Sequence, residues 1–160
     1  MTTAAPEPEP ITRWAAGTTD SAIWLNGTAV AVDDQGILIL GASGTGKSGL
    51  ALNLLALGAV LIADDGLWLD AAEGQPRIAR PTRSPDLIEA RGIGLIRAGT
   101  TRAAAPLAII VDLDRAEPER LPPRRLVAIG EALCPLILGA GHNTLAPALV
   151  LMARHGRAEV

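Results

Sequence analysis

One stretch of the sequence decides the fold: Ile37-Leu38-Ile39-Leu40-Gly41-Ala42-Ser43-Gly44-Thr45-Gly46-Lys47-Ser48. It begins with a short aliphatic run typical of a buried strand, and residues 47–57 have the apolar spacing of a helix. Between the two, residues 41–48 match the phosphate-loop pattern G-x-x-x-x-G-K-S at every specified position. In that setting the backbone N–H groups and the helix N-terminus point at one anion, so we expect the loop to bind phosphate.

The side chains of this loop indicate which phosphate compound it binds. Lys47 would place its ammonium between the β- and γ-phosphates of a nucleotide, and the hydroxyl of Ser48 would coordinate Mg²⁺. Glycine lets the backbone close around the phosphates, where a Cβ would clash. We therefore expect a nucleotide with Mg²⁺, with ATP favoured and the base left open by the loop, to be bound by Gly41, Ala42, Ser43, Gly44, Thr45, Gly46, Lys47 and Ser48.

Composition narrows the class of protein. The chain has 160 residues, 49% of them hydrophobic and none of them Phe or Tyr, so we expect one domain with an aliphatic core. A net charge of −3 argues against binding to nucleic acid or to an anionic membrane. No apolar run approaches the ~20 residues of a membrane span, and the start lacks the pattern of a secretion signal. The single cysteine, Cys134, is expected to be buried, and the chain to be cytoplasmic.

The hydrophobic pattern divides the chain into a tail and one domain. Residues 1–18 are rich in Pro, Glu, Thr and Ala and are predicted to be a disordered tail, whereas residues 19–160 are predicted to form a single phosphate-loop domain. The predicted fold class is α/β, with a mixed, mostly β core sheet, the loop helix at 47–57 and a C-terminal helix at 145–154. Residues 126–138 fit a strand or a helix. Strands are expected at 23–32, 37–40, 60–63, 67–69, 77–80 and 107–113.

Two strands end in pairs of carboxylates, which phosphoryl transfer needs for Mg²⁺ and for the proton of the nucleophile. Asp64 and Asp65 are adjacent and point to opposite sides of an extended chain, which suits a base beside a metal ligand. Asp112 and Asp114 are separated by one residue and share a face. The pattern favours the first pair by about two to one and leaves the second open.

Three stretches occur in a fixed order: residues 41–48, then Leu57-Gly58-Ala59-Val60-Leu61-Ile62-Ala63-Asp64-Asp65, then Glu89-Ala90-Arg91-Gly92-Ile93-Gly94-Leu95. Together they resemble the C-terminal catalytic domain of the HPr kinase/phosphorylase family in its short alphaproteobacterial form, from about Ser21 to Val111. The resemblance implies an ATP-dependent serine kinase acting on the phosphocarrier protein HPr and reversible with inorganic phosphate. Such an enzyme regulates the phosphotransferase system and carbohydrate metabolism.

The resemblance also assigns roles to single residues and favours Asp64 and Asp65 over the second carboxylate pair. Asp64 takes the place of the acid/base that deprotonates the substrate serine, with Asp65 beside it. Arg91 belongs to a signature loop associated with the active site and the reverse reaction. The predicted catalytic residues are Asp64, Asp65, Lys47 and Arg91, and the predicted metal ligands are Ser48, Asp65 and Glu89.

The chain departs from the family pattern on the side of the phosphate acceptor. Asn26 stands where the family usually has a histidine beside the catalytic acid, and Gly49 and Gly66 replace an acidic residue and an arginine. Asn forms hydrogen bonds but does not titrate near neutral pH. His142 lies in a Gly-rich segment and is either an ordinary loop residue or a phosphate contact. The predicted accessory positions are Asn26, Gly92, Gly94 and His142.

Three functions remain open at this point. The favoured one is a serine kinase with ATP and HPr as partners, assembled as a homo-oligomer as in family members. The changes at Asn26, Gly49 and Gly66 suggest a related kinase with another peptide or small-molecule acceptor. Loss of the family histidine suggests a nucleotide-binding regulator without phosphotransfer.

Overall fold

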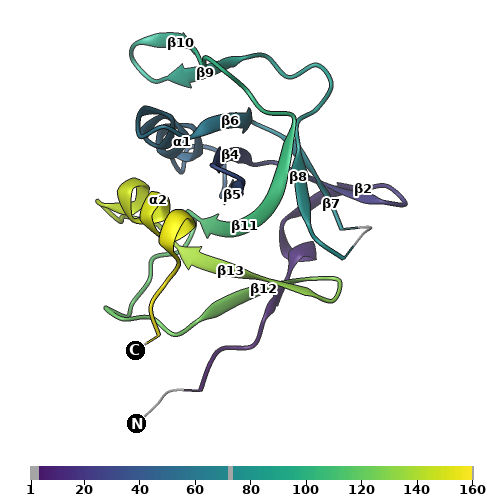
Figure 1. The fold of residues 1–160 in the computed structure, drawn as a ribbon, viewed down its shortest axis with the longest axis vertical. Coiled ribbons are helices and arrows are strands. Elements are labelled where there is room, and N and C mark those ends of the chain that lie inside the picture. The colour runs from purple at the N-terminus through teal and green to yellow at the C-terminus, as the bar shows by residue number, and fades with distance from the viewer. Residues whose placement is uncertain (1–3, 72–73, 160) are drawn as a thin grey trace.

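Three layers make up the fold, which the computed structural model describes for residues 4–71 and 74–159 (Figure 1). Two helices cover one face of a central sheet, and the other face packs against strands that fold back over it. The helices are α1 (Lys47–Ala56) and α2 (Leu145–His155), with a short 3-10 helix η1 (Ile11–Trp14). In the described ranges, no helix is long and apolar enough to cross a membrane. The strands are β1 (Glu9–Pro10), β2 (Ala15–Thr18), β3 (Ala22–Leu25), β4 (Thr28–Val32), β5 (Gln35–Leu40), β6 (Val60–Ala63), β7 (Leu67–Asp70), β8 (Arg77–Ala79), β9 (Leu87–Ala90), β10 (Gly94–Arg97), β11 (Ala104–Asp112), β12 (Arg125–Ile129) and β13 (Ala132–Leu138).

The long strand β11 joins the two sheet layers. Its C-terminal half runs parallel to β5 on one side and to β13 on the other, with Ile110 opposite Leu38 and Leu136. Its N-terminal end pairs antiparallel with β8, from which β7, β3 and β2 follow. Because β4 is antiparallel to both β5 and β6, β6 runs in the same direction as β5. The carboxyl ends of β6, β5, β11 and β13 therefore meet at one edge, which is where ligands bind in α/β sheets.

The two faces of the central strands belong to separate apolar cores. On β5, Leu38 and Leu40 face the second sheet layer, whereas Ile37 and Ile39 face the helices. All four side chains are at most 1% exposed, as expected for a strand buried on both faces. The rigid position of β5 fixes the start of the loop at residue 41.

The structure confirms both predicted helices, the hairpin of β4 and β5, and the strands before the two carboxylate pairs. Residues 126–138, which fitted a strand or a helix, lie in the antiparallel hairpin of β12 and β13. The prediction of one strand over residues 23–32 is wrong, because the chain breaks at Asn26 and Gly27 into β3 and β4. A Cβ on Gly27 would lie 2.9 Å from the carbonyl oxygen of Ile39, so glycine permits this close crossing.

The prediction of a disordered tail is wrong for residues 9–18. Strand β1 pairs in parallel with β12, and η1 and β2 follow it directly. Ile11 is 4% exposed and Trp14 packs against the same core. These two apolar side chains bury enough surface to order a segment whose Pro-rich composition suggested otherwise. Residues 1–3 of the predicted tail lie outside the described ranges.

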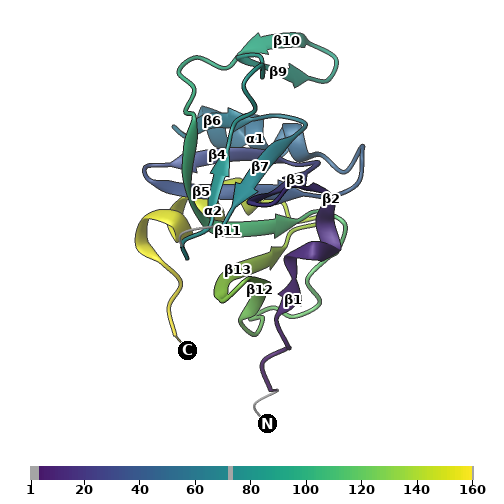
Figure 2. The same cartoon turned by 90° about the vertical axis from the view of Figure 1, so that its right-hand side faces the viewer.

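A hairpin of β9 and β10 stands apart from the main sheet, at the top of Figures 1 and 2. Strand β9 is anchored by Ile88, which is 1% exposed and belongs to the core beneath the helices. Every residue of β10 is exposed, and the neighbouring Ile93 is 79% exposed. The hairpin therefore carries an apolar tip into solvent beside the edge where the strands end.

Candidate functional site

The loop of residues 41–48 joins β5 to α1 in the conformation that its glycines allow. Gly46 has a φ of 98°, and Gly41 has a φ of 153° with no room for a Cβ, which would lie 2.6 Å from Oγ1 of Thr45. Nζ of Lys47 donates to the carbonyl oxygens of Gly41 at 2.7 Å and Ala42 at 3.1 Å. The ammonium is thus held at the loop, close to the backbone N–H groups that such a loop directs at an anion.

Strand register places Asp64 against this loop. Strand β4 pairs antiparallel with β6, with Ala29 opposite Ala63, so Thr28 and Asp64 are neighbours at the strand ends. Oδ1 of Asp64 accepts hydrogen bonds from Oγ1 of Thr28 at 2.8 Å and from Oγ of Ser48 at 2.9 Å. The described residues donate no hydrogen bond to Oδ2. The carboxylate is therefore fixed beside the loop serine and keeps one oxygen for a ligand.

A pocket of about 470 Å³ opens on this side of the loop, and we call it the carboxylate pocket. Asp64, Asp65 and Glu89 all line it, so the structure brings together three acidic residues that were predicted from two separate stretches. Asp65 has a positive φ of 67°, which Asp adopts more readily than most residues. Arg83 adds a positive charge and Trp24 an apolar wall. The pocket can therefore receive a polar group beside the phosphate loop.

The acidic residues of the site bear on whether a metal could bind beside a phosphate. Within residues 4–71 and 74–159, no three acidic, His or Cys side chains gather closely enough to hold a metal ion by themselves. Mg²⁺ at a nucleotide needs only one or two protein carboxylates, because phosphate and water oxygens complete its coordination. The hydroxyl of Ser48 and the carboxylate of Asp64, 2.9 Å apart, fit that smaller set.

Two positions that depart from the family pattern, Asn26 and Gly66, are connected through Trp24. Nε1 of Trp24 donates to Oδ1 of Asn26 at 3.2 Å, and the indole packs edge to face on Trp68 with ring centroids 4.9 Å apart. A Cβ on Gly66 would lie 2.4 Å from Cζ2 of Trp24. The indole thus occupies the space that any side chain at position 66 would need, including the arginine of the family pattern.

The alternative carboxylate pair lies on the other side of the loop and is engaged in structural contacts. Asp112 is 1% exposed and accepts from Nε of Arg115 at 2.7 Å, while Nη2 of Arg115 donates to Glu9 at 2.9 Å. Burial raises the pKa of Glu9, but the hydrogen bond and charge of Arg115 outweigh it and hold that pKa below its usual range. Oδ1 of Asp114 accepts from the backbone N–H of Ala42 at 2.9 Å. This pair therefore fixes the N-terminal strand and the start of the phosphate loop.

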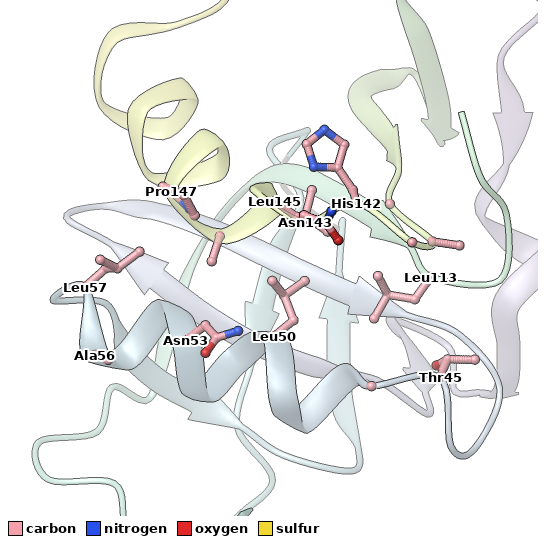
Figure 3. Close-up of a pocket in the computed structure, with 15 residues that line it drawn as sticks. Thr45, Leu50, Asn53, Ala56, Leu57, Leu113, His142, Asn143, Leu145 and Pro147 are labelled. Carbon is pink, nitrogen blue, oxygen red and sulfur yellow. The ribbon is translucent and has the colours of Figure 1, made fainter. Parts of the chain in front are cut away.

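The remaining predicted residues lie away from the three carboxylates. Arg91 and Gly92 lie in the turn between β9 and β10 and Gly94 begins β10, and none of the three lines the carboxylate pocket. Gly92 has a φ of 82°, as the tight turn requires. His142 lines a larger cavity between α1 and α2, on the opposite side of the loop (Figure 3).

Two contributors to the site, Thr28 and Trp24, were not predicted. Thr28 is fully buried and binds Asp64 although 36 residues separate them. Its only signal is a hydroxyl at the start of an otherwise aliphatic strand. The register of β4 against β6 decides that Thr28 faces Asp64. A single sequence does not specify the register of two strands that are far apart along the chain.

Comparison with known proteins places these features in a family. Residues 19–124 match the family described as the HPr Serine kinase C-terminal domain. The HPr kinase/phosphorylase of Listeria monocytogenes serotype 4a (strain HCC23) is 33% identical over 105 residues, which are 61% of this chain and 34% of that protein. The HPr kinase/phosphorylase of Mycoplasmopsis pulmonis (strain UAB CTIP) is 43% identical over 74 residues, 46% of this chain and 24% of that protein. The chain thus matches about a third or less of the length of these relatives.

A solved structure shows the same fold. The structure described as the Hpr(Ser) kinase/phosphatase from Coxiella burnetii superposes with a TM-score of 0.66, covering 82% of this chain and 88% of that one. Sequence identity is 22%, so the likeness concerns the fold. It confirms the prediction of a mixed α/β fold with a mostly β sheet.

Proposed function

The chain belongs to the family of HPr serine kinase C-terminal domains, and on that premise we propose that it transfers the γ-phosphoryl group of ATP to a serine hydroxyl. The observation that carries this proposal is the contact between Oδ1 of Asp64 and Oγ of Ser48 at 2.9 Å. It joins the two motifs, the phosphate loop and the carboxylate pair, into one site. Phosphoryl transfer depends mainly on positioning and electrostatic stabilisation, which such a site supplies.

The loop supports binding of the triphosphate. Its backbone N–H groups and the N-terminus of α1 stabilise negative charge, and Lys47 adds a full positive charge beside them. Mg²⁺, when bound, would neutralise charge on the β- and γ-phosphates. We assign its protein ligands to Ser48 and to either Asp64 or Asp65, with Glu89 nearby. The γ-phosphate then faces the carboxylate pocket.

The carboxylate pocket supports binding of the acceptor serine. Oδ1 of Asp64 is occupied by two hydroxyl donors, so Oδ2 is the oxygen that would accept the serine proton. In the transfer, the serine oxygen forms a bond to the γ-phosphorus as the bond to the β-phosphate oxygen breaks, and ADP leaves. The exposed Ile93 and Arg91 of the neighbouring hairpin would contact the protein that carries the serine.

We propose HPr as that protein, because the relatives at 33% and 43% identity are named HPr kinase/phosphorylase. The same site would remove the phosphoryl group again: an oxygen of inorganic phosphate would bond to the phosphorus of phosphoserine as the bond from phosphorus to the serine oxygen breaks, pyrophosphate would leave, and Asp64 would return the proton to the serine oxygen. We further propose a cytoplasmic homo-oligomer.

Phosphorylation of purified HPr with ATP and Mg²⁺ tests the proposal. Asp64→Asn keeps the shape of the side chain and removes the base, so we expect the rate of phosphoserine formation to fall about 10²- to 10⁴-fold. Asp20→Asn, an exposed aspartate outside the site, is the matched control and should behave as wild type. Equal rates for wild type and Asp64→Asn would refute the role of Asp64.

A kinase with another acceptor is the second candidate, and the position of Trp24 favours it. The indole over Gly66 gives the carboxylate pocket an apolar wall where the family pattern has a charge. Labelling of other proteins in a lysate, but not of several HPr proteins, would select this candidate. Binding of MgATP without transfer to any serine would instead indicate a regulator.

A further inference from the structure

A cavity lies between α1 and the start of α2, and the proposed reaction does not use it. It has a volume of about 750 Å³, within the range of sites for small molecules. One end reaches Thr45 and Gly46 of the phosphate loop, and the other reaches Leu57 at the end of α1. Figure 3 shows Leu50 extending from α1 toward Asn143 and Leu145, and Asn53 also lines the cavity from α1.

We propose that this cavity binds the nucleoside of ATP, with the adenine between Leu50 and Leu145 and with Asn53 contacting the edge of the base. The inference rests on the proposed function, because it takes the phosphate loop to bind a triphosphate. It adds a site for the part of the nucleotide that the loop itself does not contact.

Strand order determines the direction in which the nucleotide must extend. Asp64 follows β6, which lies on one side of β5 beyond β4, whereas β11 and β13 lie on the other side of β5. The cavity is built on that other side, from Leu113 after β11 and from residues 139–143 after β13. If the γ-phosphate points toward Ser48 and Asp64, the α-phosphate and nucleoside must extend away from them, over the start of α1. That path ends in the cavity.

The chemistry of the cavity fits a neutral aromatic group. Among its described lining residues there is no Asp, Glu, Lys or Arg. Several of the lining side chains are aliphatic and can pack on the two faces of a base: Leu50, Leu57, Leu113, Leu145, Ala146 and Pro147. Apart from His142, the described lining side chains do not titrate, and such a lining suits a base and a ribose better than a cation.

One side chain can recognise the base. Asn53 lies seven residues after Gly46, which places it about 10 Å along the axis of α1 from the phosphate loop. Its carboxamide is exposed and makes no hydrogen bond within residues 4–71 and 74–159. A carboxamide donates and accepts side by side, and so pairs with the N7 acceptor and N6 donor of adenine. Guanine presents two acceptors at that edge, so Asn53 favours adenine.

Hydrogen bonds of the backbone hold one wall of the cavity in place. The backbone N–H of Gly139 donates to the carbonyl oxygen of Asp112 at 2.9 Å, and that of Ala140 donates to the carbonyl oxygen of Arg115 at 3.0 Å. The backbone N–H of Thr144 donates to Nδ1 of His142 at 3.3 Å. These bonds fix residues 139–144 against the end of β11, so binding requires little rearrangement of this wall.

Calorimetric titration with two ligands, ATP and inorganic tripolyphosphate in Mg²⁺, separates the cavity from the loop. Tripolyphosphate occupies the phosphate loop only, so it reports on the proposed function by itself. We expect Asn53→Leu, which keeps the size of the side chain, to weaken ATP about 5- to 10-fold and to lower the preference for ATP over GTP. Ala56→Trp, which narrows the cavity, should weaken ATP at least 10-fold. Both variants should bind tripolyphosphate as wild type does.

The controls separate the possible results. Ala148→Trp makes the same change on the exposed face of α2 outside the cavity and should leave both affinities unchanged. Photolabelling with 8-azido-ATP should modify residues 45–57 or 139–147. Wild-type affinity for ATP in both Asn53→Leu and Ala56→Trp, or labelling on the side of Trp24 and residues 81–89, would overturn the inference. If wild type binds neither ligand, the proposed function itself fails.

Discussion

Replacing Gly66 with alanine tests whether Trp24 fixes the wall of the carboxylate pocket. Gly66 directly follows the carboxylate pair and has a φ of 154°. An added Cβ would lie 2.4, 2.9 and 3.3 Å from three atoms of the Trp24 indole. The indole cannot easily move aside, because it packs on Trp68 and donates a hydrogen bond to Asn26. Either the ring or the backbone after Asp65 must therefore shift.

Two separate costs contribute to the expected destabilisation. A side chain at a positive φ costs about 1–2 kcal/mol, and overpacking against a fixed ring costs about 1–3 kcal/mol. We therefore expect Gly66→Ala to lower the free energy of unfolding by about 2–5 kcal/mol. In a Trp24→Ala background only the first cost remains, so the double-mutant cycle should give a coupling of about 1–3 kcal/mol.

Urea unfolding of wild type, the two single variants and the double variant can be followed by far-ultraviolet circular dichroism. This signal reports on the backbone and does not depend on the fluorescence of the indole that Trp24→Ala removes. Gly130→Ala is the matched control, because Gly130 has a φ of 59° and an added Cβ there has nothing within 4 Å. It should cost about 1–2 kcal/mol from backbone strain alone. A Gly66→Ala cost that is the same with and without the Trp24 indole would refute the reasoning.

Three further predictions concern ion pairs and the thiol. The hydrogen bonds of Arg125 to Glu117, at 2.7 and 2.9 Å, hold the pKa of Glu117 below its usual range. The stabilisation is therefore present above about pH 4.3 and is lost as the pH falls through the pKa of the folded state. Between pH 3 and 7, urea titration should show that the free energy of unfolding falls less in acid for Glu117→Gln than for wild type, by about 1 kcal/mol. Arg115→Met leaves the buried carboxylate of Asp112 without its cation and should lower the free energy of unfolding in urea at neutral pH by about 3 kcal/mol. A decrease below about 1 kcal/mol would contradict the importance of that ion pair. Burial raises the pKa of Cys134 to about 12, so a thiol reagent at pH 8 should label it only after denaturation, and rapid labelling of the folded chain would show that the thiol is accessible.

The elements that could be predicted from the sequence are those whose signal is local. Helix α1 begins at Lys47 and the chain turns at Gly58 with a φ of 102°, as apolar spacing and glycine indicated. The hairpin before the loop was predicted from two aliphatic runs and a polar turn, and it formed with Ala29 opposite Leu38. In each case the residues that decide the structure are within about a dozen positions of one another.

What could not be predicted depends on contacts between distant parts of the chain. The order of residues 9–18 requires β12, which follows more than 110 residues later and pairs with Glu9 through Val127. The bond between Thr28 and Asp64 requires the register of β4 against β6. The division of residues 22–32 into two layers is decided by β7, which binds β3 but not β4. Composition and periodicity do not specify such pairings.

The two sides of the phosphate loop differ in how they are built. A loop of this kind would hold phosphate mainly through backbone groups, which require glycine and a strand-to-helix connection but few particular side chains. The carboxylate pocket is shaped by side chains that touch one another, so a change at one position requires a change at the next. Trp24 fills the space above Gly66 and donates to Asn26, which couples the departures at these two positions. Restoring the family arginine at position 66 would therefore require the removal of Trp24 as well, and acceptor choice should follow the pair together.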